Sequence, residues 1–288
     1  MKGSRKILLF AVSVTALVAV GFVYVSKYTY RKAISMSDEK EIKASLDAGL
    51  ASLKIARGKP GAVFDATVET NNEYDVTSDV DYSVRDRVGY LSLSTEDKEH
   101  HGRSIHISNL ESTTWTTNFT DAVPISFDIQ LGLGKGEFDF TGLNVKDLNL
   151  SSGASSVYLR FDQPNKSVIP NLNIEAGLSK FQAYGLGNAN FDHFKFEGGV
   201  GGYTLDFSGK MDRECDADIE VGLGSLTIIL PDNVGAKVYY EKSIVSHLDM
   251  EKAFSEQSEN TYVSSNYYSA KGKINMHIDA EVVSVKIR

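Results

Sequence analysis

Several metal-binding side-chain types are concentrated in one short stretch of the chain. A zinc site needs about four ligands with tetrahedral geometry, held by further hydrogen bonds. Adjacent histidines on a strand point to opposite faces, and the sequence supplies no fixed fourth ligand. We therefore expect a solvated, charged hairpin tip and no bound metal. The stretch contains Asp97, Glu99, His100, His101 and His106.

Two glycine-rich motifs have a superficial likeness to ligand sites. Gly132–Gly136 is similar to a phosphate loop, but such a loop needs a following helix whose amides bind the anion. The alternating stretch Glu137–Phe140 follows instead. Gly198–Tyr203 is similar to a calcium-binding β-roll turn, but Tyr203 stands where an aspartate would ligate the ion. We expect no cofactor.

No arrangement of nucleophile and base is recognisable in the sequence. Cys215 lies between Glu214 and Asp216, whose charges would raise its pKa and blunt its reactivity. Acids such as Asp139 and Asp206 alternate with apolar residues and so face solvent. Polysaccharide-active β-helix enzymes place acids on such faces, so glycan cleavage is the enzyme-class alternative. Because no two-carboxylate cluster is identifiable, we expect a protein that is not an enzyme.

Two tyrosine pairs are the candidate partner surface: Tyr239, Tyr240, Tyr267 and Tyr268. Tyrosine combines apolar area with a hydrogen-bonding group, which suits protein interfaces and sugar stacking. The alternative is that these rings cover the open ends of a sheet, where unpaired strand edges need shielding. The sequence leaves both interpretations open.

A repeat between Phe127 and Leu230 sets the elements that position these residues. Each copy has apolar residues five and three positions before a glycine, and four and six positions after it. Apolar residues two apart face one side of a strand, and glycine suits the tight turn between two strands. Two atypical copies extend the repeat, at Ala44–Ile55 and at Met276–Ile287, where Glu281 replaces the glycine. The structural turn glycines are Gly49, Gly134, Gly153, Gly177, Gly199 and Gly224.

One strand–turn–strand unit cannot bury its apolar face alone, whereas stacked copies can. We therefore predict an all-β solenoid, with two packed, mainly parallel sheets and about seven rungs roughly 4.8 Å apart. Residues 36–56 have a helix-like composition, but the repeat predicts strand, Gly49 and strand. The alignment places one interior column at Ile129, Leu148, Leu172, Phe194 and Ile219.

Two insertions interrupt the repeat, at residues 61–126 and 231–272. The first is predicted to form an antiparallel meander that Trp115 packs against the solenoid. The second contains a short helix near Met250–Glu256. The meander strands are predicted at Val63–Val68, Tyr74–Val84, Val88–Ser94, Arg103–Ser108 and Thr114–Phe119, with turns at Asn71-Asn72 and His101-Gly102.

Residues 1–32 form a separate segment, followed by the β domain at 33–288. Ile7–Val25 carries no charge and would span about 29 Å as a transmembrane helix, the thickness of a bilayer's hydrocarbon core. A cleaved signal peptide is the alternative, but its apolar region is usually shorter. We predict a single-pass anchor in a bacterial cytoplasmic membrane, with the C-terminal domain outside. The interfacial aromatic residues would be Tyr24, Tyr28 and Tyr30.

Charge argues against a nucleic-acid partner. The whole chain has a net charge of −8, and residues 33–288 carry 24 basic against 38 acidic side chains, a net charge of −14. Such a domain is repelled by nucleic acid and by an anionic membrane surface. The single cysteine offers no disulfide.

One combination of motifs points to a known family. Trp115 is followed by Val123-Pro124 and then by Gly-x-Gly turns at Gly132/Gly134 and Gly222/Gly224. This pattern resembles the toast-rack domains of LiaF-type cell-wall-antibiotic-response proteins, over roughly residues 40–288.

The resemblance implies an envelope-associated β domain without known catalytic residues. Some members act with a membrane histidine kinase in envelope stress signalling, but this chain has one predicted span where such members have several. We expect a non-catalytic interaction or regulatory module with an envelope protein partner. An adhesin-like scaffold is the alternative among binding proteins.

Overall fold

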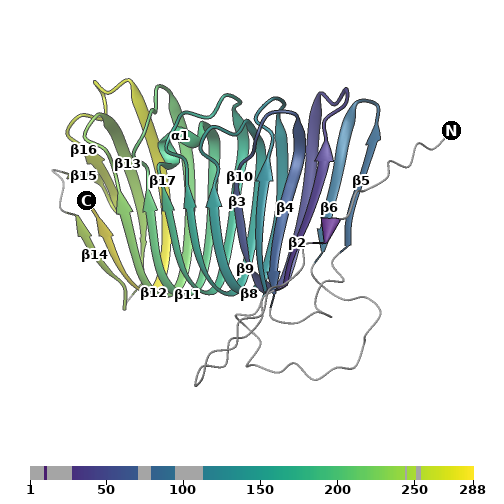
Figure 1. Cartoon of the computed structure of the whole chain (residues 1–288). Helices are drawn as coiled ribbons and strands as arrows, with labels where there is room; N and C mark the ends of the chain where they lie inside the picture. Colours follow the sequence, from purple (N-terminus) through teal and green to yellow (C-terminus); the bar gives the residue numbers. More distant parts are fainter. Residues whose placement is uncertain (1–9, 12–27, 71–78, 95–112, 244, 251–253) are drawn as a thin grey trace, which may run out of the picture.

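The computed structural model describes residues 10–11, 28–70, 79–94, 113–243, 245–250 and 254–288. These residues are almost entirely β-structure, and all their strands join one sheet, with a single short helix, α1 (Leu186–Ala189) (Figure 1). No helix among them is both long and apolar enough to cross a membrane. The all-β prediction is confirmed.

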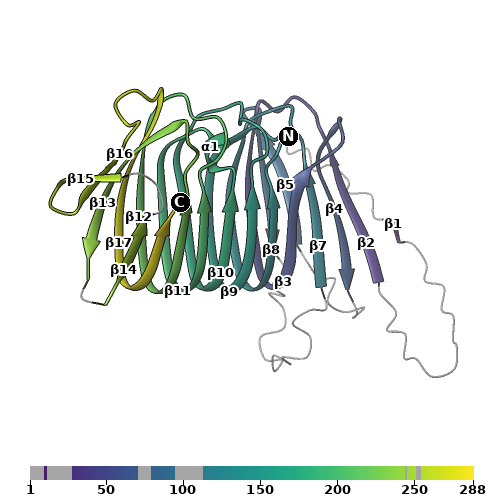
Figure 2. The same cartoon turned by 90° about the vertical axis from the view of Figure 1, so that its left-hand side faces the viewer.

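Seven long strands form the body of the molecule and pair in parallel, one beside the next. Each strand bends in its middle, so that its two halves stand side by side as a U with the bends along one edge (Figures 1 and 2). The strands continue through the bends, so one sheet folds over on itself where two separate sheets were predicted. In stacking order they are β3 (Glu41–Arg57), β8 (Ile125–Asp139), β9 (Val145–Arg160), β10 (Ile169–Tyr184), β11 (Phe191–Asp206), β12 (Glu214–Ile229) and β17 (Gly272–Ile287).

The seven predicted copies all fall in these strands, and residues 41–57 are strand despite their helix-like composition. Alternate side chains point inward and form columns of buried residues along the stack. The five residues predicted to share one column occupy two adjacent columns. The first column holds Ala44, Phe127, Leu148, Leu172, Phe194, Ala217 and Met276. The second holds Leu46, Ile129, Leu150, Ile174, Phe196, Ile219 and Ile278.

The sequence alignment of two copies is wrong by two positions. The register places Gly132 and Gly222, not Gly134 and Gly224, level with Gly153. A shift of two residues keeps every side chain on the same face, so apolar alternation fits both registers equally well. The column at the bend therefore consists of Gly49, Gly132, Gly153, Gly177, Gly199, Gly222 and Glu281.

Both ends of the stack are covered by a rung in two pieces. At the N-terminal end, β6 (Val88–Ser94) and β7 (Thr113–Phe119) pair in parallel with the first and second halves of β3. The predicted antiparallel meander is therefore only partly right. The antiparallel strands are β2 (Tyr28–Ser35), β4 (Ala62–Thr70) and β5 (Asp79–Arg85).

Trp115 joins the insertion to the solenoid as predicted. It is 2% exposed and pairs with Leu53 of β3 on one side and Val68 of β4 on the other. The predicted strand Arg103–Ser108 and the turns at 71–72 and 101–102 lie outside the described residues.

The C-terminal end repeats this construction. Strands β13 (Val234–Lys242) and β14 (His247–Met250) pair in parallel with the two halves of β17. Strands β15 (Phe254–Ser258) and β16 (Thr261–Ser264) add antiparallel pairs. The predicted short helix is wrong, because Met250 ends β14 and Phe254 begins β15.

The predicted anchor lies outside the described residues except for β1 (Phe10–Ala11), which pairs with β2. Tyr24 is also outside them, whereas Tyr28 and Tyr30 belong to β2. Tyr30 packs against the core and so belongs to the β domain. The boundary drawn at residue 33 falls inside β2, which pairs with β4 and packs Tyr30 and Ile34 against the core.

Candidate interaction surface

Three of the four tyrosines of the predicted partner surface lie at the surface, and one does not. Tyr240 is 1% exposed and belongs to the core, which removes it from the set. Tyr239 is exposed and its ring lies 5.3 Å from that of His277. Tyr267 and Tyr268 meet edge to face, and the Tyr267 hydroxyl donates a 2.7 Å hydrogen bond to Asn275 Oδ1.

The candidate nucleophile is inaccessible. Cys215 is 4% exposed, with its Sγ 3.7 Å from the Sδ of Met211. Burial raises the pKa of its thiol to about 12, and the nearby charges of Asp216 and Glu214 add to the shift. The sequence predicted the direction but named only the charges, whereas burial is the larger cause.

The outward acids singled out from the sequence have structural partners. Asp139 accepts a hydrogen bond from the backbone of Thr141 and a 2.5 Å ion pair from Arg160. Burial acts to raise the pKa of Asp139, but the bonds from Thr141 and Arg160 outweigh it and lower that pKa. Asp206 accepts in the same way from the backbone of Ser208. Both carboxylates thus close a turn at the end of a rung.

No group of three or more possible metal ligands occurs in the part of the chain that the structure describes. The cluster around His100 and His101 lies outside that part. The Gly132–Gly136 and Gly198–Tyr203 motifs both lie within long strands, β8 and β11.

At the bends the rungs approach each other closely. A Cβ atom on Gly153 would lie 2.7 Å from the carbonyl oxygen of Gly132, and one on Gly199 would lie 2.8 Å from that of Gly177. Glycine is therefore required there by backbone contact between rungs. The same absence of side chains leaves a channel along the bends.

On one side of this channel runs a series of exposed apolar side chains, which we call the aliphatic row. Strand pairing places these residues level with one another over all seven rungs, about 29 Å at roughly 4.8 Å per step. Leu178 is 64% exposed, and the other large members after the first rung are 39% to 46% exposed. The aliphatic row consists of Leu50, Leu133, Ala154, Leu178, Val200, Leu223 and Val282.

On the other side, four successive rungs carry acids at one position, which we call the carboxylate row: Glu175, Glu197, Glu220 and Asp279. Like charges directly opposite each other on neighbouring strands are destabilising. The only ion pair of the row among the described residues joins Glu197 to Lys195, at 2.5 Å. The hydrogen bond that Lys195 donates to Glu197 raises the pKa of Lys195, and the charges of Glu197, Glu220 and Glu175 add to the shift.

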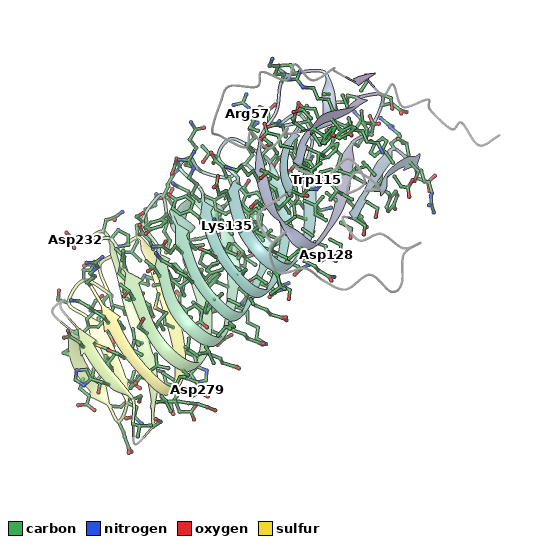
Figure 3. All side chains as sticks on the ribbon, turned by 60° about the horizontal axis from the view of Figure 1, so that its bottom comes forward. Arg57, Trp115, Asp128, Lys135, Asp232 and Asp279 are labelled. Carbon is green, nitrogen blue, oxygen red and sulfur yellow. The ribbon has the colours of Figure 1, made fainter. Side chains whose placement is uncertain are left out.

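The channel forms a groove of about 440 Å³ that contacts the carboxylate row and has Gly177, Gly199 and Gly222 in its floor. Glu281, in the glycine column of the last rung, lines its end. Figure 3 shows the bends facing forward, with Asp128 and Asp279 along one side of them and Lys135 on the other.

Sequence reasoning did not find this surface. The sequence signal for this surface is an aliphatic residue directly after each bend glycine. The alternation of the second half of each rung makes that position face outward, where a polar residue is expected. Leu178, Val200 and Leu223 follow Gly177, Gly199 and Gly222 in this way. The two-residue alignment error concealed the third of these pairs.

The structure is similar to several solved structures, among them the following three. A protein of Clostridium sporogenes ATCC 15579, described provisionally as a cell adhesion protein, is 20% identical with a TM-score of 0.46, covering 91% of this chain and 98% of its own. A provisionally described adhesin of Bacteroides fragilis NCTC 9343 is 14% identical, with a TM-score of 0.38 and coverages of 90% and 97%. A similarly described adhesin of Parabacteroides merdae ATCC 43184 is 11% identical, with a TM-score of 0.33 and coverages of 90% and 96%.

No curated protein matches the sequence. The family profile for the N-terminal domain of toast_rack, DUF2154, matches residues 25–182 and 163–229. The matched residues include six of the seven long strands completely, all but β17, and the strands β2, β4, β5, β6 and β7 at the N-terminal end of the stack. The chain therefore belongs to the toast_rack N-terminal domain family, DUF2154.

Proposed function

We propose that this chain is a non-catalytic interaction module of the bacterial cell envelope, which binds a protein partner through the bends of its rungs. The observation that carries the proposal is the aliphatic row. Soluble proteins rarely expose large contiguous apolar patches, and those that they expose often mark binding sites. The row is built on paired strands, so its side chains are held in fixed positions without help from a partner.

The proposed location follows from the uncharged stretch Ile7–Val25, which is long enough to cross a bilayer as a helix. Tethering would hold the domain close to membrane and envelope proteins and raise their effective concentration. A regulatory role in the envelope stress response is supported by the resemblance to LiaF-type proteins. In this role the domain acts by occupying a partner and not by changing a substrate.

Proximity labelling in cells tests the proposal. The labelling enzyme is fused after Arg288 of the full-length chain, and the control carries it on residues 1–32 alone. We expect a small set of envelope proteins to be labelled by the full chain and not by the control. Identical labelling by the two fusions would contradict a partner-binding role for the β domain.

A screen for glycan cleavage by the full-length chain separates this proposal from the enzyme alternative. We expect no release of reducing ends from cell-wall or capsular polysaccharides. Turnover that is lost when Glu197 and Glu220 are replaced by Gln would contradict a non-catalytic function.

A further inference from the structure

We infer that the groove along the bends takes a cationic amphipathic helix, whose aliphatic face lies on the aliphatic row and whose Lys or Arg side chains meet the carboxylate row. This inference rests on the proposed function and names the chemistry of its partner. The supporting features are the in-register exposed apolar side chains, the neighbouring acids and the glycine floor between them.

The negative charges of the carboxylate row are only partly balanced by Lys195. Glu175, Glu197, Glu220 and Asp279 stand one rung apart, and such stacking of like charges opposes strand pairing. Only Glu197 gains an ion pair within the described residues, and the cation is its own neighbour Lys195. A partner that brings several cations to this row would relieve the repulsion and so bind more tightly.

The charge is confined to one side of the groove and one part of the stack. At the same position the earlier rungs carry Asp47, Gln130 and Ser151, so the acids concentrate from β10 to β17. Beyond the aliphatic row lie Lys135 and Lys180. A basic stripe on the partner must therefore lie on one flank of its apolar face.

The spacing of the rows favours a helix over an extended chain. A helix lying across the rungs presents a new turn every 5.4 Å or so, close to the rung spacing of roughly 4.8 Å. A strand laid in the same direction repeats its face only every 6.7 Å or so. Across the three steps from Glu175 to Asp279, only the helix keeps its side chains within reach of successive acids.

The floor of the groove has room for such an element. Gly177, Gly199 and Gly222 present no side chain, and the groove has a volume of about 440 Å³. Leu178, Val200 and Leu223 follow these glycines directly and are exposed beside the groove, although they do not line it. The carboxylate row and the aliphatic row thus flank the column of bend glycines on opposite sides.

Binding of synthetic peptides to the purified full-length chain tests the inference. The probe is a labelled Leu/Lys peptide of about 20 residues, about 30 Å long as a helix, with its lysines beside one leucine stripe. One control peptide replaces every Lys by Glu, and a second scrambles the order of Leu and Lys. Binding is measured by fluorescence anisotropy at low and high salt.

Two double variants isolate the rows. L178S/L223S removes two side chains of the aliphatic row, and E197Q/E220Q removes two carboxylates while keeping their size. Matched controls are V168S, an exposed aliphatic residue in the loop between β9 and β10, and E137Q, an exposed acid after the bend of β8. All replaced side chains are exposed or at the surface, and unchanged melting curves verify folding. Because the full-length chain includes the predicted anchor, all variants are measured in the same detergent. Any binding of the peptide to detergent micelles is then the same for every variant.

We expect the Leu/Lys peptide to bind the native chain and both control variants equally. Its dissociation constant should rise about tenfold or more in each double variant. The dependence on salt should largely disappear in E197Q/E220Q. Equal binding to native chain and double variants, tight binding of the Leu/Glu peptide, or no binding at all would overturn the inference. Equal binding of the scrambled peptide would overturn the helical form of the partner.

The failure of this inference is distinguishable from the failure of the proposed function. If proximity labelling finds envelope partners and the double variants leave that labelling unchanged, the domain binds partners elsewhere and the groove assignment is wrong. If labelling finds none while the peptide result holds, the groove chemistry stands and the envelope role is wrong. Vesicles of neutral lipid serve as a second probe. If the native chain binds these vesicles but not the peptide, and L178S/L223S loses the vesicle binding, the aliphatic row binds a lipid surface and the inference is overturned.

Discussion

The two ends of each rung are built by opposite means. At the bends, the rungs turn through glycines and expose aliphatic side chains. At the other end, which we call the rim, loops join one rung to the next and bury their polar and aromatic side chains. Both ends reverse the chain direction, so the difference between them is not required by the turn itself.

The rim is held by buried side chains. Asn165 is 7% exposed, and it accepts a hydrogen bond from the backbone of Val145 at 2.9 Å and donates to the carbonyl of Val145 at 2.6 Å. Phe140 and Phe161 stack at 5.2 Å between ring centres. Asn188, in α1, donates to the carbonyl of Phe161.

The side-chain hydrogen bonds at the bends are longer than those of the rim: the Tyr203 hydroxyl lies 3.4 Å from the carbonyl oxygens of Ala176 and Gly177. Gly153 and Gly199 meet neighbouring backbones, and Leu178 points into solvent with 64% of its area exposed. Stability therefore depends on the rim and on the inward columns, while the bends are free to carry a binding surface. The following predictions test this division, from the largest expected effect to the smallest.

Phe161→Ala should reduce the free energy of unfolding by about 3–5 kcal/mol, because it leaves a cavity beside Phe140 in a fully packed rim. The matched variant at the bend, Leu178→Ala, should change that free energy by less than about 0.5 kcal/mol. Urea denaturation measures both. A similar loss in the two variants would contradict the division between rim and bend.

Gly153→Val should destabilise by about 1–3 kcal/mol, because its Cβ would meet the carbonyl oxygen of Gly132 and force the rungs apart. The neighbouring Ala154→Val adds the same kind of side chain at an exposed position of the aliphatic row and should be nearly neutral. Thermal denaturation compares the two. An unchanged melting temperature for Gly153→Val would show that the rungs do not approach at this column.

Cys215 should make the native state sensitive to alkali. Its pKa is raised from 9.0 to about 12 by burial, so the stability it contributes is complete below pH 9 and declines as pH rises towards 12. At pH 10 the loss should be about 1 kcal/mol. Cys215→Ala should show a shallower decline than the native chain in urea titrations at pH 8 to 10. Parallel declines would mean that the thiol ionises at its ordinary pKa in the native state.

Leu178→Ser should leave stability almost unchanged, within about 0.5 kcal/mol, because the side chain is already in water. The same change should raise the dissociation constant of the Leu/Lys peptide, by less than L178S/L223S does. A large loss of stability would indicate that the aliphatic row belongs to the core and not to a binding surface.

The inward columns could be predicted because burial imposes a period of two on every rung, including the atypical copies at Ala44–Ile55 and Met276–Ile287. The register at Gly134 and Gly224 could not, since a shift of two residues preserves that period. The split rungs at the two ends escaped prediction for a related reason. A short strand such as β6 has the same alternation of buried and exposed residues whether its partner strand is parallel or antiparallel.

The predicted tyrosine surface contained one residue too many, because adjacent residues on a strand face opposite sides. Tyr239 and Tyr240 therefore had to separate, one outward and one into the core. The aliphatic row was visible in the sequence as Leu or Val after glycine, but its meaning depended on knowing which glycines stand level. The sequence therefore predicts which side chains of a strand face outward. It does not predict which outward side chains of different strands lie side by side, because that depends on the strand register.

Site-specific photocrosslinking in cells tests most directly whether the bends are the binding surface. A benzoylphenylalanine replaces Leu178 at the bend or, as the control, Val168 in the rim loop, two exposed aliphatic residues of one rung region. We predict that irradiation joins a partner protein to the chain from position 178 and not from position 168. A crosslink from position 168 alone, equal crosslinks from both, or none from position 178 would contradict the account.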